Sequence, residues 1–283
     1  MYLLARRALS QEKRVSILQI GNVLAFIAVV VVNALAGGTK LLNGRNTADV
    51  SAAYPTLVTP AGFTFSIWGV IYILLFAFIF FQMLPRHRRD SFNGRVSYLF
   101  ILSCAFNIMW LFLWQYNYIA LSVPLIFGLL ATLVAIYIRL GIGKSKATRN
   151  EKLCVHLAFS VYLGWITIAS IADVSSALAS LNWNGLGIDP AVWAELVMVV
   201  ALAITLAALA TRIDIAYGAV IVWALVGIAA NQGGHPGVVE TAGASIFVAT
   251  VVILAIIVLS FVRTPSKQSA QDREQQKQNA PNL

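Results

Sequence analysis

Long apolar runs recur along almost the whole chain, and they constrain its fold more than any other feature. A run of about 20 apolar residues forms a helix that crosses the hydrocarbon core of a membrane. Composition agrees, because only 11% of the residues are charged, whereas soluble domains carry about 25%. The sequence therefore predicts an all-α, polytopic membrane helix bundle. Eight spans are expected, at Ile17–Ala36, Phe63–Leu84, Ser97–Gln115, Tyr118–Leu140, Leu153–Ala172, Ala191–Ala210, Ile213–Ala230 and Ala242–Val262.

The basic residues support this alternation of spans. If the N-terminus lies inside and the chain crosses the membrane eight times, only Lys40 and Arg45 lie on the outer side. The other 18 of the 20 Lys and Arg residues then lie on the cytoplasmic side of the membrane. Cytoplasmic loops of membrane proteins carry such an excess of Lys and Arg. We therefore predict a multi-pass protein of the cell (cytoplasmic) membrane with both termini cytoplasmic. The net charge of +9 is then a signal for topology and for contact with membrane lipid, and no nucleic-acid partner is expected.

The first span has a second interpretation. Arg6, Arg7 and Arg14 precede an apolar run that ends at Ala34-Leu35-Ala36, as in a secretory signal with its cleavage site. Cleavage there would leave seven helices and an outer N-terminus. The run is nearly as long as a full span and longer than most signal cores, so the sequence favours a retained helix.

Few side chains in the spans could carry out chemistry. The sequence shows no nucleophile–base pair, no phosphate loop and no metal-ligand spacing around Cys104 and Cys154. We therefore predict no enzyme activity, no catalytic residue, no metal site and no cofactor. Three carboxylates, Asp173, Glu195 and Asp214, lie near the ends of predicted spans. They leave open a different function, an ion-coupled secondary transporter or permease of a small molecule.

Aromatic and amide side chains form three stripes at helical spacing. Trp68 and Tyr72 lie four residues apart in the second span, and Trp114 lies at the end of the third. Tryptophan and tyrosine at such positions are typical of the membrane interface, and Trp114 and Trp193 fit that interpretation. Buried indole and amide groups need hydrogen-bond partners, so a cavity for a flat hydrophobic ligand, open toward the outer half, is the alternative to simple packing. The stripes are Phe65, Trp68 and Tyr72; Asn107, Trp110 and Trp114; and Tyr162, Trp165 and Ala169, with Asp173 further along.

These stripes resemble the tryptophan-rich sensory protein family, also called the translocator protein or peripheral benzodiazepine receptor family. The second helix of that family carries a proline before F-x-x-x-W-x-x-x-Y, and here Pro60 precedes FTFSIWGVIYILL. Its third helix carries N-x-x-W, matched here by NIMWLFLW, and its fifth carries P-Y-L-x-W-x-x-x-A-x-x-x-N, matched here by VYLGWITIASIAD. The resemblance covers residues 15–185. The chain departs from the family where YPTLVTPAG lacks a tryptophan, and where Val161 and Asp173 replace the proline and the asparagine.

The resemblance implies a five-helix bundle that binds porphyrins, sterols or related hydrophobic molecules, often as a homodimer. It implies a divergent branch with this organisation: a cytoplasmic segment at 1–15, a translocator-like core at 16–185, three additional helices at 186–263 and a disordered cytoplasmic tail at 264–283. The function expected is a sensor or carrier for a planar hydrophobic ligand that is porphyrin-like (tetrapyrrole-like) or lipid-like. Carried over by position, the ligand-binding residues are Trp68, Tyr72, Asn107, Trp110, Tyr162, Trp165 and Ala169.

Overall fold

Every regular element in the described part of the protein is a helix. The computed structural model describes residues 2–87 and 90–263. The long helices are α1 (Tyr2–Asn33), α3 (Ile67–Met83), α5 (Leu99–Gln115), α6 (Ile119–Leu140), α8 (Leu157–Ser180), α9 (Pro190–Arg212), α10 (Ile215–Asn231) and α11 (Pro236–Arg263). The short helices are η1 (Ala34–Gly38), α2 (Thr47–Ala53), η2 (Gly62–Ser66), η3 (Pro85–His87), α4 (Ser91–Val96), α7 (Arg149–Glu151), η4 (Lys152–His156) and η5 (Gly185–Gly187).

The eight long helices correspond one to one to the eight predicted spans. Six of them, with their short extensions, are long and apolar enough to cross a membrane. The other two, α5 and α10, are apolar helices of 17 residues each. At 1.5 Å per residue these two are about 26 Å long, at the lower limit of the length that spans a bilayer. The prediction of a polytopic helical membrane bundle is confirmed.

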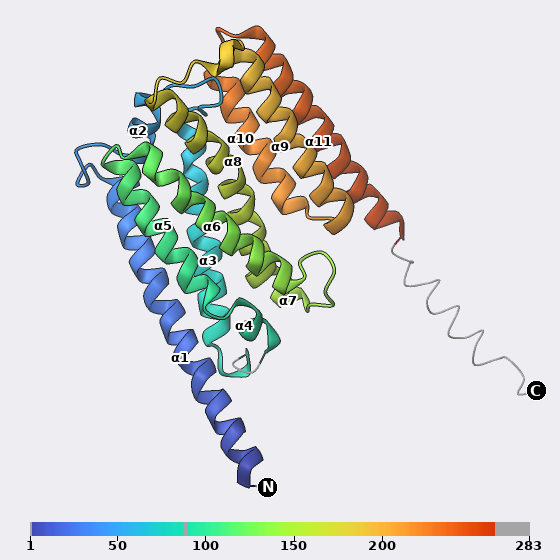
Figure 1. The fold of residues 1–283 in the computed structure, drawn as a ribbon. Coiled ribbons are helices and arrows are strands. Elements are labelled where there is room, and N and C mark those ends of the chain that lie inside the picture. Colours follow the sequence, from blue (N-terminus) through green and yellow to red (C-terminus); the bar gives the residue numbers. More distant parts are fainter. Residues whose placement is uncertain (1, 88–89, 264–283) are drawn as a thin grey trace, which may run out of the picture.

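Five of the helices close into a ring. Helix α1 packs against α3 and α5, α6 packs against α5 and α8, and α3 packs against α8. The order around the ring is therefore α1, α3, α8, α6 and α5. Every one of these helices turns one face toward a shared interior (Figure 1). The three stripes predicted from the sequence lie on α3, α5 and α8, three of the five walls.

The last three helices form a second layer beside the ring. Helix α10 packs against α8, and α9 and α11 pack against α10 and against each other (Figure 1). Helix α8 is therefore enclosed from both sides. In its most apolar stretch 72% of the residues are buried, against 22–39% in the other five long spans. This burial explains why α8 has no broad polar or lipid-facing stripe.

Three boundaries differ clearly from the predicted ones. The first span was expected from Ile17, but α1 begins at Tyr2. The fifth span was expected to end at Ala172, but α8 continues to Ser180, because the side chain of Asp173 finds a hydrogen-bond donor inside the bundle. The eighth span was expected from Ala242, but α11 begins at Pro236. The predicted disordered tail, residues 264–283, lies outside the described residues.

The segment between the first two spans, residues 37–62, contains the short helix α2. Asn46 caps this helix: its side chain accepts a hydrogen bond from the Asp49 backbone N–H at 2.8 Å, and the Asp49 carboxylate accepts one from the Asn46 N–H at 3.0 Å. This reciprocal pair is a capping box. The cap stabilises α2 where it packs against α5, so it places a cover over one end of the ring.

Candidate functional site

Aromatic rings from three helices meet inside the ring around Trp68. The Trp68 ring is stacked on Tyr72 at a centroid distance of 5.7 Å. It also lies 6.4 Å from Trp110, 6.1 Å from Tyr162 and 6.2 Å from Trp165. We call these five residues the aromatic cluster. The stripes on α3, α5 and α8 therefore converge on one point, and their rings do not point outward into lipid.

The aromatic cluster is closed on one side and partly open on the other. Trp110, Tyr162 and Trp165 are each less than 5% exposed, whereas Trp68 and Tyr72 are half-buried. The rings contact one another, so they themselves occupy the space that the sequence predicts as a cavity. The partly exposed side of the cluster is therefore the side formed by Trp68 and Tyr72 of α3.

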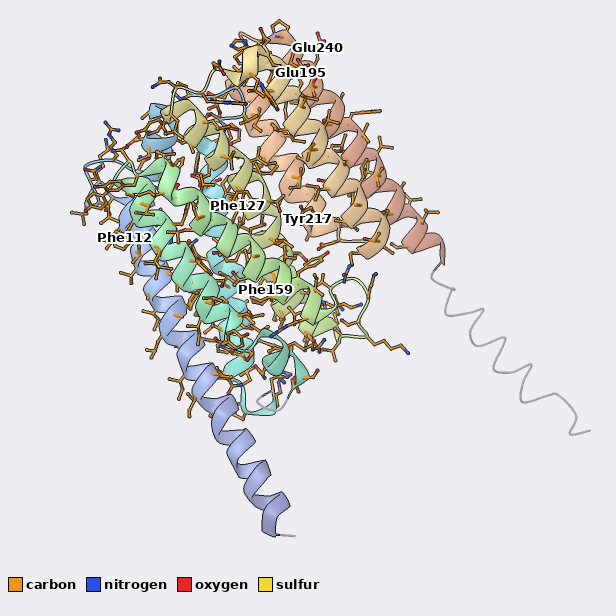
Figure 2. The ribbon with its side chains drawn as sticks, in the orientation of Figure 1. Phe112, Phe127, Phe159, Glu195, Tyr217 and Glu240 are labelled. Carbon is orange, nitrogen blue, oxygen red and sulfur yellow. The ribbon has the colours of Figure 1, made fainter. Side chains whose placement is uncertain are left out.

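Fully buried phenylalanines form the floor beneath the aromatic cluster. Phe78 of α3 lies 5.3 Å from Phe100 of α5 and 5.1 Å from Phe159 of α8, edge to face in both pairs. All three are 0% exposed. Phe159 lies toward the α7 end of the bundle, while Phe112 and Phe127 lie further toward the opposite end (Figure 2). The phenylalanines therefore close the cluster on the side of the α7 end.

A chain of amide and hydroxyl groups crosses the ring next to the aromatic cluster. The Asn33 side chain of α1 donates a hydrogen bond to Asn107 Oδ1 at 2.7 Å, and Asn107 Nδ2 donates one to the Tyr162 hydroxyl at 3.1 Å. Asn107 is 0% exposed. Asn33 was not predicted as a site residue. Its polar amide near the end of a long apolar run was the signal that could have identified it.

Replacing Asn107 with leucine is expected to destabilise the bundle. The change leaves the Asn33 amide and the Tyr162 hydroxyl without their buried partner, and interhelical hydrogen bonds in membranes contribute about 0.6–1.7 kcal/mol each. We expect a loss of roughly 1–3 kcal/mol, measured as a lower midpoint in thermal unfolding of the detergent-solubilised protein.

The matched control is Thr205→Val. Thr205 is also 0% exposed, but its hydroxyl bonds only within its own helix, to Ala201 O. This variant should melt close to the unmodified chain. A midpoint for Asn107→Leu equal to that of Thr205→Val would contradict the structural role of the amide chain.

Three polar groups of the aromatic cluster have no hydrogen-bond partner. They are the Tyr72 hydroxyl, the Trp110 indole N–H and the Trp165 indole N–H. The Trp110 N–H interacts electrostatically with the Asp173 carboxylate, but not at hydrogen-bond geometry. Buried donors are normally paired, so three unpaired groups around one cluster are an arrangement that a polar atom of a bound molecule would complete.

The comparison with protein families agrees with this geometry. The family model described as TSPO-like protein matches residues 19–262. The chain belongs to this TSPO-like family. The comparisons with curated proteins and with solved structures each found no match.

The TSPO-like match also bears on the second layer. It begins in α1 and ends in α11, so it includes α9, α10 and α11 as well as the five-helix ring. The sequence interpretation placed these three helices beyond the five of the family it resembles. In the matched family model they belong to the same region as the ring.

The carboxylates of this TSPO-like protein have different environments. Asp173 is 1% exposed and accepts hydrogen bonds from the Ser122 hydroxyl at 2.9 and 3.2 Å. Asp214 is the N-cap of α10: it accepts a hydrogen bond from the Tyr217 backbone N–H at 3.1 Å, and the Ser160 hydroxyl donates to it at 2.7 Å. Asp214 thus has a structural role in starting α10. Glu195 is half-buried in the first turns of α9.

The segment before and within α2 covers the site at the α2 end of the bundle. The Trp114 N–H donates a hydrogen bond to Thr47 O at 3.3 Å, and the Gln115 amide donates one to Arg45 O at 2.8 Å. Trp114 is only 4% exposed, so it lies beneath this cover and not in the interfacial position that the sequence predicted. Its ring is stacked on Trp110 at 5.9 Å, which connects the cover to the aromatic cluster.

Helix α10 fixes the entry into α3. The Trp223 N–H donates a hydrogen bond to Thr64 O at 3.1 Å, and the Ala61 N–H donates one to Gly227 O at 2.9 Å. The Phe63 ring packs edge to face on Trp223 at 5.5 Å. These contacts hold η2, the turn immediately before Trp68. Sequence reasoning missed them, because the partners lie more than 150 residues apart and carry no shared pattern.

The remaining predicted positions fit the fold without a direct role. Ala169 is half-buried in α8, one turn beyond Trp165, where its small side chain leaves room beside the rings. Within residues 2–87 and 90–263, no group of three His, Cys, Asp or Glu side chains could hold a metal ion. Trp193, predicted at the interface, is half-buried and donates a hydrogen bond to Gly185 O at 2.9 Å.

Proposed function

We propose that this membrane protein binds a planar hydrophobic ligand, tetrapyrrole-like or lipid-like, at the aromatic cluster, and that it acts as a sensor or carrier of that ligand. The observation that carries the proposal is the convergence of five aromatic side chains from three helices on one point, with three unpaired polar groups among them. Stacked rings contribute about 0.5–1.5 kcal/mol per aromatic pair beyond the area that they bury. Membership of the TSPO-like family supports the same class of ligand.

The ligand would replace the contacts that Trp68 and Tyr72 make with the other rings. Both side chains are half-buried on the partly exposed side of the cluster. The other three aromatic side chains are buried in the interior of the five-helix bundle. The Tyr72 hydroxyl and the two indole N–H groups would then orient polar atoms of the ligand. The homodimer implied by the family resemblance stays a prediction.

Protoporphyrin binding tests the proposal with a matched pair of variants. Trp165→Phe removes one unpaired N–H and part of the stacking surface, so we expect about tenfold weaker binding, equivalent to ~1.4 kcal/mol. Trp193→Phe changes a tryptophan in the second layer, outside the cluster, and should bind like the unmodified chain. Binding is read from the porphyrin absorbance in detergent micelles, since the variants change the protein fluorescence. Equal loss in both variants, or in neither, would refute the site.

A second function, an ion-coupled transporter, is supported by one observation, the burial of Asp173. An intramembrane carboxylate is a common component of proton pathways. An ion-coupled transporter reconstituted in proteoliposomes should show a proton flux that is lost when Asp173 is neutralised. Ligand binding at the aromatic cluster requires no such flux. The burial of Asp214 does not support a transporter, because its carboxylate caps α10 by accepting a hydrogen bond from the Tyr217 backbone N–H.

A further inference from the structure

Asp173 lies beside the aromatic cluster, and binding by stacking alone makes no use of its charge. It is eight residues beyond Trp165 in α8, which is about 12 Å along the helix axis toward the end that carries α2. Trp110 connects the two places, because its ring lies 6.4 Å from Trp68 while its N–H interacts with the Asp173 carboxylate. The carboxylate and the rings therefore border one region inside the five-helix ring.

The hydrogen bonds around Asp173 leave its charge uncompensated. The Ser122 hydroxyl has one proton, and three oxygens lie within its reach: Ile119 O at 2.7 Å and both Asp173 oxygens. One O–H donates to one of them at full strength, so it cannot satisfy a carboxylate and a carbonyl together. The neighbouring Trp110 N–H also favours the carboxylate, but it is a neutral group and lies outside the usual hydrogen-bond geometry. Asp214, by contrast, has two separate donors.

No positive side chain balances Asp173 either. Among the residues that the structure describes, Lys, Arg and His form ion pairs only with Asp90 and Glu151, both near the α4 and α7 end. A carboxylate in a membrane interior is costly unless something compensates its charge. Within the described residues no positive side chain supplies this compensation, so we expect it from a proton or from a bound cation.

The surrounding surface favours a cation. Besides Asp173, the end of the bundle that carries α2 and the first turns of α9 and α11 contains four carboxylates against two basic side chains, although the whole chain has a net charge of +9. Glu195 and Glu240 lie at this end (Figure 2). A local excess of negative charge attracts cations. The four acidic side chains are Asp49, Asp189, Glu195 and Glu240, and the basic ones are Lys40 and Arg45.

We infer that the site also accepts an organic cation, with its apolar ring system against the aromatic cluster and its positively charged nitrogen close to Asp173. This inference rests on the proposed function and adds a chemical class of ligand to it. Aromatic faces attract cations through their quadrupole, so the tryptophan rings and the carboxylate act on the same charge.

Two probes of equal shape test this inference on the full chain in nanodiscs of zwitterionic lipid. One is (1-naphthylmethyl)trimethylammonium, and the other is its neutral isostere, in which a tert-butyl group replaces the trimethylammonium group. Calorimetric titration, with empty nanodiscs subtracted, gives the ratio of the two affinities. We expect the unmodified chain to bind the cation about tenfold or more tightly. Asp173→Asn should bring this ratio to about one, with the affinity for the neutral probe retained.

Two control variants separate charge from structure. Ser122→Ala removes the hydrogen bond but keeps the carboxylate, and Asp214→Asn neutralises a buried carboxylate away from the cluster. Both should keep the preference for the cation. Equal binding of the two probes by the unmodified chain would overturn the inference while leaving the stacking site intact. A preference that survives in Asp173→Asn would also overturn it. Binding of neither probe would refute the proposed site, and the inference with it.

Discussion

Substitution of Gly227 with alanine is expected to lower the stability of the protein, although glycine-to-alanine changes within helices are usually favourable. A Cβ atom at this position of α10 would lie 2.0 Å from Thr64 Oγ1 and 2.9 Å from Thr64 Cβ. Thr64 is 0% exposed, so it cannot move aside, and α10 must shift away from η2. We expect a loss of roughly 2–4 kcal/mol, seen as a thermal midpoint about 5–10 °C lower in detergent micelles.

The matched control is Gly243→Ala in α11, where an added Cβ has no neighbour within 4 Å. Here the alanine should gain up to about 1 kcal/mol from its higher helix propensity. The double variant Gly227→Ala with Thr64→Ala should recover part of the loss, because it removes the closest atom. If Gly227→Ala melts at or above the unmodified midpoint, the close packing of α10 on η2 is wrong.

The same change is expected to weaken ligand binding at the aromatic cluster. Helix α10 holds η2 through Trp223 and Gly227, and Trp68 is the second residue of α3, which begins where η2 ends. A shift of α10 therefore changes where Trp68 lies. Porphyrin affinity should fall in Gly227→Ala and remain unchanged in Gly243→Ala, measured at a temperature where both variants are folded. This result would show that the second layer supports the site in the five-helix ring.

Substitution of Gly143 with alanine is expected to have an effect of similar size at the opposite end of the molecule. Gly143 has a φ of +79°, a conformation that is strained for other residues, and its added Cβ would lie 1.9 Å from the Arg212 carbonyl oxygen. The backbone conformation alone costs about 1–2 kcal/mol, and overpacking adds roughly 1–3 kcal/mol. The loop after α6 would separate from the end of α9, where Arg212 donates a hydrogen bond to Ile142 O at 3.2 Å.

Gly187→Ala is the control that isolates the packing contribution. Gly187 has a similar φ of +76°, but an added Cβ there has no atom within 4 Å. Both variants carry the conformational cost, and only Gly143→Ala carries the clash. The unfolding midpoint of Gly143→Ala should therefore be the lower of the two by several degrees. Equal midpoints would mean that the loop and α9 are not in close backbone contact.

The fold class was predictable because the membrane restricts the chain so strongly. Each apolar run must satisfy its own backbone hydrogen bonds, so it must be a helix. The eight predicted spans therefore match the eight long helices, from α1 to α11. The ends of the helices were less predictable where a tertiary hydrogen bond offsets the cost of burying a polar side chain. Asp173 reads as the end of a span, yet α8 continues past it because Ser122 of α6 donates to its carboxylate.

The sequence predicted which residues share a face of one helix in the candidate site. It did not predict which of these faces contact one another. Helical periodicity places Trp68 and Tyr72 on one stripe, and likewise Asn107 and Trp110. Periodicity cannot show which stripes face each other, so Trp114 was read as an interfacial anchor, although it is buried beneath α2. Asn33 was missed for the same reason, since its role depends on α1 packing beside α5.

By itself, the sequence determined that this protein is a helical membrane protein with an aromatic-rich core, because hydrophobicity and helical periodicity are local properties that can be read along the chain. Only the tertiary structure decided that the stripes converge on Trp68, that Asp173 lies beside them with no counter-charge among the described residues, and that α10 holds the start of α3. These three features depend on how helices distant in sequence pack, and in lipid that packing follows from shape and from interhelical hydrogen bonds, which apolar periodicity does not encode.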